Sequence, residues 1–203
     1  MSSTFRTASV SDNVVDPLVL LASDRSVARD RQDPLVDRCV LGTLTREGRA
    51  ALRTLVLRDI DERLAIFYSR SSAKHLELMN HDCQASLLVW LPSIEVQYRL
   101  EAQFEEMPKV EIDDRWQLKP NAAKRLDAIY ERSPQSTLIE DVERFETLFA
   151  ATVPPVRAPH NATGCYIKPM RVERLALRKD PHMHDRRAYT RNGEFWTMRR
   201  LVP

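Results

Sequence analysis

The feature that most constrains the fold is a series of five β-strand patterns between residues 38 and 104. RCVLGTLT, AALRTLVLRD and RLAIFYS follow one another over residues 38–69, with short turns at 47–48 and 60–62. ASLLVWL and IEVQYRLEAQF come next, and the helix-like KHLELMNHD lies between the third and fourth strands. Consecutive strands with connections this short indicate an antiparallel sheet or barrel, because parallel pairing would need a long crossover after each strand.

Helical patterns and a hairpin complete the expected fold. Residues 111–131 have a polar helical pattern, and apolar residues recur at helical spacing over 138–149, which predicts an amphipathic helix packed on the sheet. The Pro-rich segment 153–159 is the expected linker to a C-terminal strand region. There, RRAYT and EFWTMRRL flank Asn192-Gly193, a strong hairpin signal. The predicted fold class is mainly β with flanking helices.

Composition excludes several classes of protein. Charged residues make up 30% of the 203, but the net charge is only +2, so we expect no nucleic-acid partner. No segment approaches the ~20 apolar residues of a membrane span, and the N-terminus lacks the pattern of a signal peptide. The three cysteines have long, unpatterned spacing, which fits reduced thiols. We therefore expect a cytoplasmic protein with no membrane partner.

The sequence offers no glycine-rich phosphate loop. Its four glycines are too far apart for a G-x-G-x-x-G or Walker pattern, so any bound phosphate must be held by side chains. Ser71, Ser72 and Lys74 stand where a helix begins, so two hydroxyls and an ammonium could converge there on one dianion. Solvated surface charge is the alternative explanation for each cation.

Metal and nucleophile signatures are weak. His182 and His184 alternate beside Asp185, but no spacing rule supplies a third ligand, so we expect no metal. The chain has no G-x-S-x-G motif, and nothing around Cys83 matches a nucleophile signature.

Seven segments together resemble the pyridoxamine 5′-phosphate oxidase family, which includes the phenazine-biosynthesis flavin oxidases. They occur in the family's order as RTLVLR (53–58), FYSRSSAK (67–74), SLLVW (86–90), EVQYRLEA (95–102), RSPQS (132–136), HDRRAY (184–189) and WTMRRLVP (196–203). The resemblance implies an FMN-binding split β-barrel over residues 31–203, after a partly flexible extension over residues 1–30. It also implies a homodimer with two equivalent flavin sites at the subunit interface.

The resemblance further implies which residues contact each ligand. The cofactor-binding positions would be Arg53, Thr54, Leu55, Val56, Leu57, Arg58, Tyr68, Ser69, Ser72, Lys74, His75, Gln97, Gln135, Ser136 and Arg186. The substrate-binding positions would be Arg115, Lys119, His182 and His184, and the residues expected to act in catalysis are His184, Arg58 and His182.

Departures from the family pattern lie mostly on the substrate side. Arg115 replaces a tyrosine, Lys119 an arginine and Ala123 a serine, all in the segment that would hold the vitamer phosphate. His182 likewise replaces an arginine, and on the flavin side Leu175 replaces a tryptophan. Guanidinium and ammonium groups are not interchangeable, so the vitamer site is less well preserved than the FMN site.

The expected activity is therefore an FMN-dependent oxidase with an altered substrate. It would move a hydride from a small amine or aromatic heterocycle to flavin N5, with O₂ as acceptor. The alternatives are a true pyridoxine or pyridoxamine 5′-phosphate oxidase, a non-catalytic flavin-binding protein and an NAD(P)H-flavin reductase.

Overall fold

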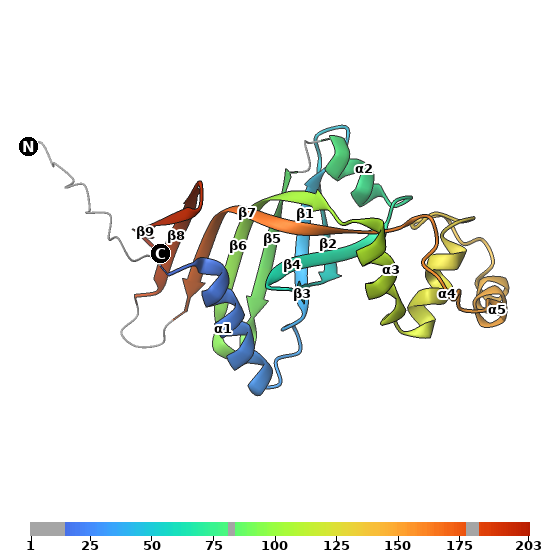
Figure 1. Cartoon of the computed structure of the whole chain (residues 1–203), viewed down its shortest axis with the longest axis horizontal. Coiled ribbons are helices and arrows are strands. Elements are labelled where there is room, and N and C mark those ends of the chain that lie inside the picture. Colours follow the sequence, from blue (N-terminus) through green and yellow to red (C-terminus); the bar gives the residue numbers. More distant parts are fainter. Residues whose placement is uncertain (1–14, 81–83, 178–182) are drawn as a thin grey trace, which may run out of the picture. The chain divides into compact units, whose positions relative to one another are not determined.

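The structure, a computed structural model, describes residues 15–80, 84–177 and 183–203 (Figure 1). Its contacts divide the chain into two compact units. The central unit comprises Cys39–Ser86 and Ala102–Lys168, and the terminal unit comprises Met1–Arg38, Leu87–Glu101 and Pro169–Pro203. Each unit is described by itself.

Nine strands in the described part of the chain make it mainly β, as predicted. They are β1 (Arg38–Leu44), β2 (Ala50–Val56), β3 (Arg58–Ile60), β4 (Arg63–Ser69), β5 (Gln84–Leu91), β6 (Val96–Glu106), β7 (Ala162–Ala176), β8 (Asp185–Asn192) and β9 (Phe195–Leu201). Hydrogen bonds connect them in the order β2-β1-β5-β6-β7-β4-β3, with β8 on β7 and β9 on β8. Buried and exposed residues alternate along β6, as expected for a strand with one face toward a core.

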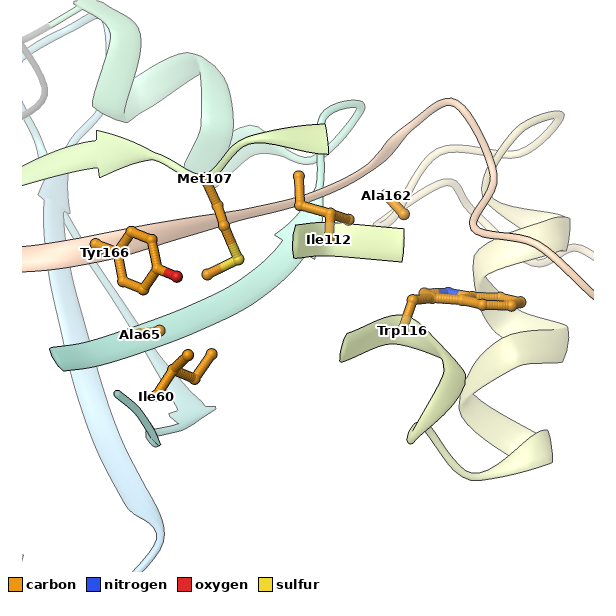
Figure 2. Close-up of a cluster of buried hydrophobic side chains, with 7 residues drawn as sticks. All are labelled: Ile60, Ala65, Met107, Ile112, Trp116, Ala162 and Tyr166. Atoms are coloured by element: carbon orange, nitrogen blue, oxygen red, sulfur yellow. The ribbon is translucent and has the colours of Figure 1, made fainter. Parts of the chain in front are cut away.

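The core of the central unit forms where β4 and β7 meet helix α3 (Lys109–Gln117). The antiparallel register places Ala65 of β4 opposite Tyr166 of β7. Ile112 and Trp116 lie four residues apart on one face of α3, and both are almost fully buried. The whole cluster consists of Ile60, Ala65, Met107, Ile112, Trp116, Ala162 and Tyr166 (Figure 2).

The predicted helical region 111–131 forms two helices, because Pro120 cannot continue the first one. These are α3 and α4 (Asn121–Ile129). Helix α2 (Ala73–Asn80) matches the predicted helix between the third and fourth strands.

The amphipathic helix predicted over 138–149 differs from the structure in its start and in its packing. Helix α5 (Val142–Ala151) begins four residues later, because the Asp141 side chain accepts a hydrogen bond from Arg144 N (2.9 Å) and caps it. No residue of α5 is buried, and it contacts α4, where Arg125 lies over the Phe149 ring. The prediction that this helix packs on the sheet was wrong.

The terminal unit contains a helix that the sequence reasoning did not identify, α1 (Pro17–Asp30). Asp16 caps it by accepting a hydrogen bond from Leu18 N at 2.7 Å. Only four of its residues are buried, and one of them is Arg25, so its apolar stripe is too narrow to stand out in the sequence. In the same unit, a 3₁₀ turn at Pro92–Ile94 links β5 to β6.

The predicted C-terminal hairpin is present. Asn192 of β8 pairs with Phe195 of β9, so the two turn residues are Gly193 and Glu194, one position later than predicted. Gly193 has φ +61°, which suits glycine at the first turn position. Within the described ranges, no helix is long and apolar enough to cross a membrane.

Candidate functional site

A turn rich in serine hydroxyls leads from β4 into α2 in the central unit. Ser72 Oγ donates to Ser69 O at 2.6 Å, which closes the turn in front of the helix. The hydroxyl oxygens of Ser69 and Ser71 lie 2.8 Å apart. The turn thus places hydroxyls and a helix N-terminus side by side, a combination that favours anions.

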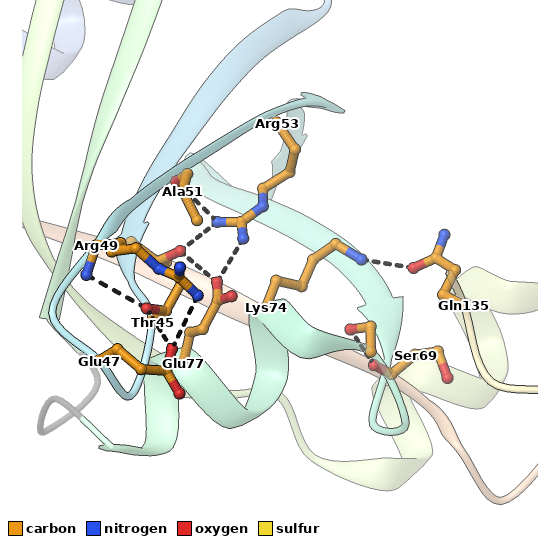
Figure 3. A network of polar contacts seen from close by, with 11 residues as sticks. Thr45, Glu47, Arg49, Ala51, Arg53, Ser69, Lys74, Glu77 and Gln135 are labelled. Carbon is orange, nitrogen blue, oxygen red and sulfur yellow. Dashed lines mark hydrogen bonds and ion pairs between the residues drawn. The ribbon is translucent and has the colours of Figure 1, made fainter. Parts of the chain in front are cut away.

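Lys74, in the first turn of α2, joins two segments that are distant in the sequence. Its Nζ donates to Gln135 Oε1 at 2.6 Å, across 61 residues (Figure 3). The structure therefore brings together two residues that the family resemblance assigned to the cofactor. The adjacent Ser136 has φ +74°, an uncommon conformation for a residue with a side chain, and such strain concentrates at functional sites.

Arg53 of β2 extends toward the same helix. Its guanidinium forms an ion pair with Glu77 of α2 (Figure 3). It also donates to Thr43 Oγ1 of β1. Thr43 in turn donates to Glu77 Oε2 at 2.5 Å. Thr43 and Glu77 were not among the predicted site residues. For Glu77 a signal existed, because it follows Lys74 by three residues and shares its face of the helix.

The electrostatics of this cluster fit a phosphate group. Burial, together with the charge of Arg53, lowers the pKa of Lys74 to about 8, although the charge of Glu77 partly opposes both. Only 9% of Lys74 is exposed, so two buried or half-buried cations face a single carboxylate. A bound dianion would relieve this excess positive charge.

His75 and Tyr68 lie next to this cluster. Their ring centroids are 5.9 Å apart, and the Tyr68 hydroxyl lies 2.8 Å from Cys165 Sγ. Nδ1 of His75 is buried and has no hydrogen-bond partner among the described residues. Burial lowers the pKa of His75, and the charge of Arg70 adds to this effect. His75 thus has a ring nitrogen available for a ligand.

The other predicted cofactor residues of the central unit extend along β2 into β3. Thr54 is exposed, Leu55 and Val56 are half-buried, and Leu57, between the two strands, is buried. Arg58 is exposed on β3, where it pairs in register with Ala65. Their assignments to FMN, and that of Arg58 to catalysis, stay predictions.

The predicted substrate residues of the central unit form ion pairs within the chain. Lys119 pairs with Asp127, which also accepts a hydrogen bond from Trp116 Nε1 at 2.9 Å. Arg115 Nη2 lies 3.3 Å from Asp61 Oδ2. Both cations are thus partly neutralised by the chain's own carboxylates, and no sequence pattern indicated these partners.

The remaining predicted site residues belong to the terminal unit. Gln97 is half-buried on β6, and Arg186 of β8 donates to Glu173 Oε2 of β7 at 2.9 Å. His184 and Arg186 line a groove of about 380 Å³ with Met183, Asp185 and residues 200–203. His182 lies outside the described residues. Among those described, no three His, Cys, Asp or Glu side chains are grouped as a metal site.

Comparison with known proteins identifies the family. No family model matches the sequence. The pyridoxine/pyridoxamine 5′-phosphate oxidase of Ectopseudomonas mendocina is 32% identical over 197 residues, which cover 93% of this chain and 89% of that protein. The chain belongs to this oxidase family. The Gluconobacter oxydans enzyme of the same name is 31% identical and covers 95% of this chain and 96% of its own length.

Solved structures with the fold of this oxidase family are also similar to the chain. PhzG from Burkholderia lata, solved in complex with tetrahydrophenazine-1-carboxylic acid, superposes with a TM-score of 0.81 at 25% identity, over 95% of both chains. A pyridoxamine 5′-phosphate oxidase-related, FMN-binding protein from Nostoc punctiforme has the same fold, with a TM-score of 0.75 at 20% identity. The predicted family and its split-barrel fold are therefore confirmed.

Proposed function

We propose that this protein is an FMN-dependent oxidase whose substrate is a small amine or an aromatic heterocycle. The observation that carries the proposal is the contact between Lys74 and Gln135 beside the serine turn. It joins two of the family's cofactor positions into one cationic cluster, in which Lys74 and Arg53 face the single carboxylate of Glu77.

The residues of this cluster suit the FMN phosphate. Lys74 and Arg53 would supply charge, and the serine turn would supply hydroxyl donors. His75 Nδ1, buried without a partner among the described residues, would be a further contact. On the family pattern, we also assign Gln97 and Arg186 to the cofactor. Bound FMN supplies hydride acceptance at N5 and reoxidation by O₂, which yields hydrogen peroxide.

The substrate assignment depends on the ion pairs of Arg115 and Lys119. A phosphorylated vitamer would need these cations, yet Lys119 is held by Asp127 and Arg115 by Asp61. Breaking an ion pair to bind a phosphate costs part of the binding free energy. These contacts favour a substrate without a phosphate group. His184 would contact this substrate, and we also assign His182 and Arg58 to the substrate side on the family pattern.

We further propose that residues 31–203 form a homodimer with shared FMN sites. Apolar side chains are exposed on α5 and just before it, where Leu138 is 82% and Val142 60% exposed. An exposed apolar surface of this kind is typical of an interface. A second copy of the chain would cover it.

An anaerobic titration tests the proposed activity. The FMN-loaded protein is mixed with pyridoxine phosphate, pyridoxamine phosphate or a reduced phenazine carboxylate, and the flavin absorbance is followed. We expect the phenazine to bleach the flavin and air to restore it, with no bleaching by either vitamer. Bleaching by a vitamer would identify a true vitamer oxidase, and bleaching by NAD(P)H alone a flavin reductase. A spectrum unchanged by every donor would contradict the enzymatic function.

A further inference from the structure

Glu173 is a buried carboxylate in the middle of β7 that the family assignment leaves without a role. Only 7% of the residue is exposed. It lies in the terminal unit, on a strand whose neighbouring Val172 is fully buried on the opposite face. A buried carboxylate needs partners for both oxygens.

Three arginines supply these partners. Arg186 Nη2 donates to Glu173 Oε2 at 2.9 Å, and Arg99 Nη1 lies 3.6 Å from the same oxygen. Arg171 forms an ion pair with Oε1. The Arg186 side chain is 31% exposed and the Glu173 side chain 8%. The Glu173 carboxylate is thus the more deeply buried partner of this ion pair.

Its ionisation follows from these contacts. Burial alone would raise the pKa of Glu173, but hydrogen bonds from Arg186 and Arg171 and the charges of Arg171 and Arg99 outweigh it, so the pKa is lowered. The carboxylate therefore stays charged at neutral pH.

The strand register directs Arg186 toward both this carboxylate and the groove. Glu173 pairs with Ala188, and Leu175 pairs with Arg186, so Glu173 and Arg186 are diagonal neighbours on one face. Arg186 also lines the groove with His184 and Arg200. A guanidinium carries five N–H donors in a planar fork, so Arg186 can bond Glu173 through Nη2 and still present donors to a ligand.

We propose that Glu173 is a positioning residue, whose carboxylate fixes the Arg186 guanidinium so that it meets the cofactor in the orientation that binding requires. The inference rests on the proposed function, because Arg186 is one of the proposed FMN contacts. An arginine side chain loses rotamer freedom when it is ordered, which opposes binding. Glu173 removes this cost before the cofactor arrives.

Glu101 provides a matched control. It is a glutamate of β6 in the same unit, and its Oε1 accepts from Arg171 Nη1 at 3.0 Å. Its partner Arg171 also contacts Glu173, but no contact between Glu101 and Arg186 is seen among the described residues. Glu101→Gln therefore disturbs the same arginine group and leaves the Glu173–Arg186 contact in place.

The test measures FMN affinity by flavin fluorescence in Glu173→Gln, Glu101→Gln, Arg186→Ala and the double variant of Glu173 and Arg186. We expect Glu173→Gln to raise Kd about tenfold and Glu101→Gln to raise it less than about twofold. In the Arg186→Ala background, Glu173→Gln should raise Kd by less than about twofold more, because the arginine that Glu173 positions is absent. Full additivity of the two changes would overturn the inference.

A second readout uses the protein without FMN. ¹⁵N relaxation of the Arg186 side chain should show a guanidinium that is ordered in the wild type and in Glu101→Gln, and mobile in Glu173→Gln. Equal order in all three would overturn the inference and leave the proposed function intact. A wild-type chain that binds no FMN would overturn both. If Glu173→Gln does not fold, Arg186→Lys is tested in its place. A single ammonium cannot bridge the Glu173 carboxylate and the cofactor as the planar guanidinium does. Wild-type FMN affinity in Arg186→Lys would contradict the proposal.

Discussion

Lys74 is the residue on which the proposed FMN site depends most. Its folded-state pKa of about 8 lies below its ordinary value of 10.5. Between these values the unfolded chain binds a proton that the folded chain does not, so the free energy of unfolding rises as pH increases from about 8 to 10.5. Below about 8 the buried charge lowers the stability of the protein without ligand.

The same pKa predicts how FMN affinity depends on pH. The phosphate needs a charged Lys74, so affinity should fall as pH rises above about 8. Lys74→Gln should weaken binding about 10- to 100-fold at pH 7 and remove this pH dependence. Isothermal titration calorimetry across pH 6.5–9.5 measures both effects; a wild-type profile that matches the flat profile of the variant would contradict the role of Lys74.

At this scale the sequence indicated the charged residues but not their partners. Lys74 and Gln135 could be assigned because they stand in recognisable segments, and the structure shows them in contact. Glu173 could not be assigned, because a carboxylate in a sequence looks the same whether it is solvated or buried among arginines, and for Glu77 the only signal was its spacing from Lys74. Only the tertiary contacts distinguish these two cases.

At the scale of elements, the corner between α3 and α4 depends on Asp127. Asp127→Ala would leave the indole N–H of Trp116 buried without a partner and Lys119 unpaired. We expect the free energy of unfolding to fall by about 2–4 kcal/mol, as measured by urea denaturation. The exposed pair of Lys109 and Asp113 provides the control, since Asp113→Ala should cost less than about 1 kcal/mol. An equal decrease in the free energy of unfolding in Asp127→Ala and Asp113→Ala would show that the burial of Asp127 is unimportant.

The pairing of β4 with β7 requires a glycine at position 164. A Cβ there would lie 2.9 Å from Phe67 Cδ1 and 3.1 Å from the carbonyl oxygen of Ile66. Gly164→Ala should therefore lower the free energy of unfolding by about 1–3 kcal/mol. At Gly42 the nearest atom is 3.2 Å away, on the flexible side chain of Leu52, so Gly42→Ala should have a smaller effect. Thermal unfolding of both variants tests this ranking of the two stability losses. A larger loss of stability in Gly42→Ala than in Gly164→Ala would contradict it.

Elements with a strong local pattern were predicted well. The strands β1, β2, β4, β5 and β6 and the final hairpin follow from alternation and turn residues, whereas β3 was predicted as the end of β2. Helix α1 was missed because much of its anchoring is polar: Asp24 accepts from Tyr98 Oη at 2.5 Å and from Arg174 Nε at 2.8 Å. The packing of α5 was mispredicted because an apolar helical face in a sequence does not indicate whether the sheet, another helix or a second chain covers it.

For the molecule as a whole, we predict a dimer. Light scattering should give twice the 23.5 kDa chain mass, and the unfolding temperature should rise with protein concentration, because association stabilises the folded chain. Addition of FMN should raise it further. A monomer at micromolar concentration, with an unfolding temperature independent of dilution, would contradict the shared cofactor site.

The most direct test of the central claim is an equilibrium titration of FMN into the purified protein, followed by the quenching of flavin fluorescence, with Lys74→Gln beside the wild type. We predict saturation at one FMN per chain in the wild type and markedly weaker binding in the variant. Unsaturable binding, or the same isotherm for both proteins, would contradict the claim that this side-chain cluster holds the flavin phosphate.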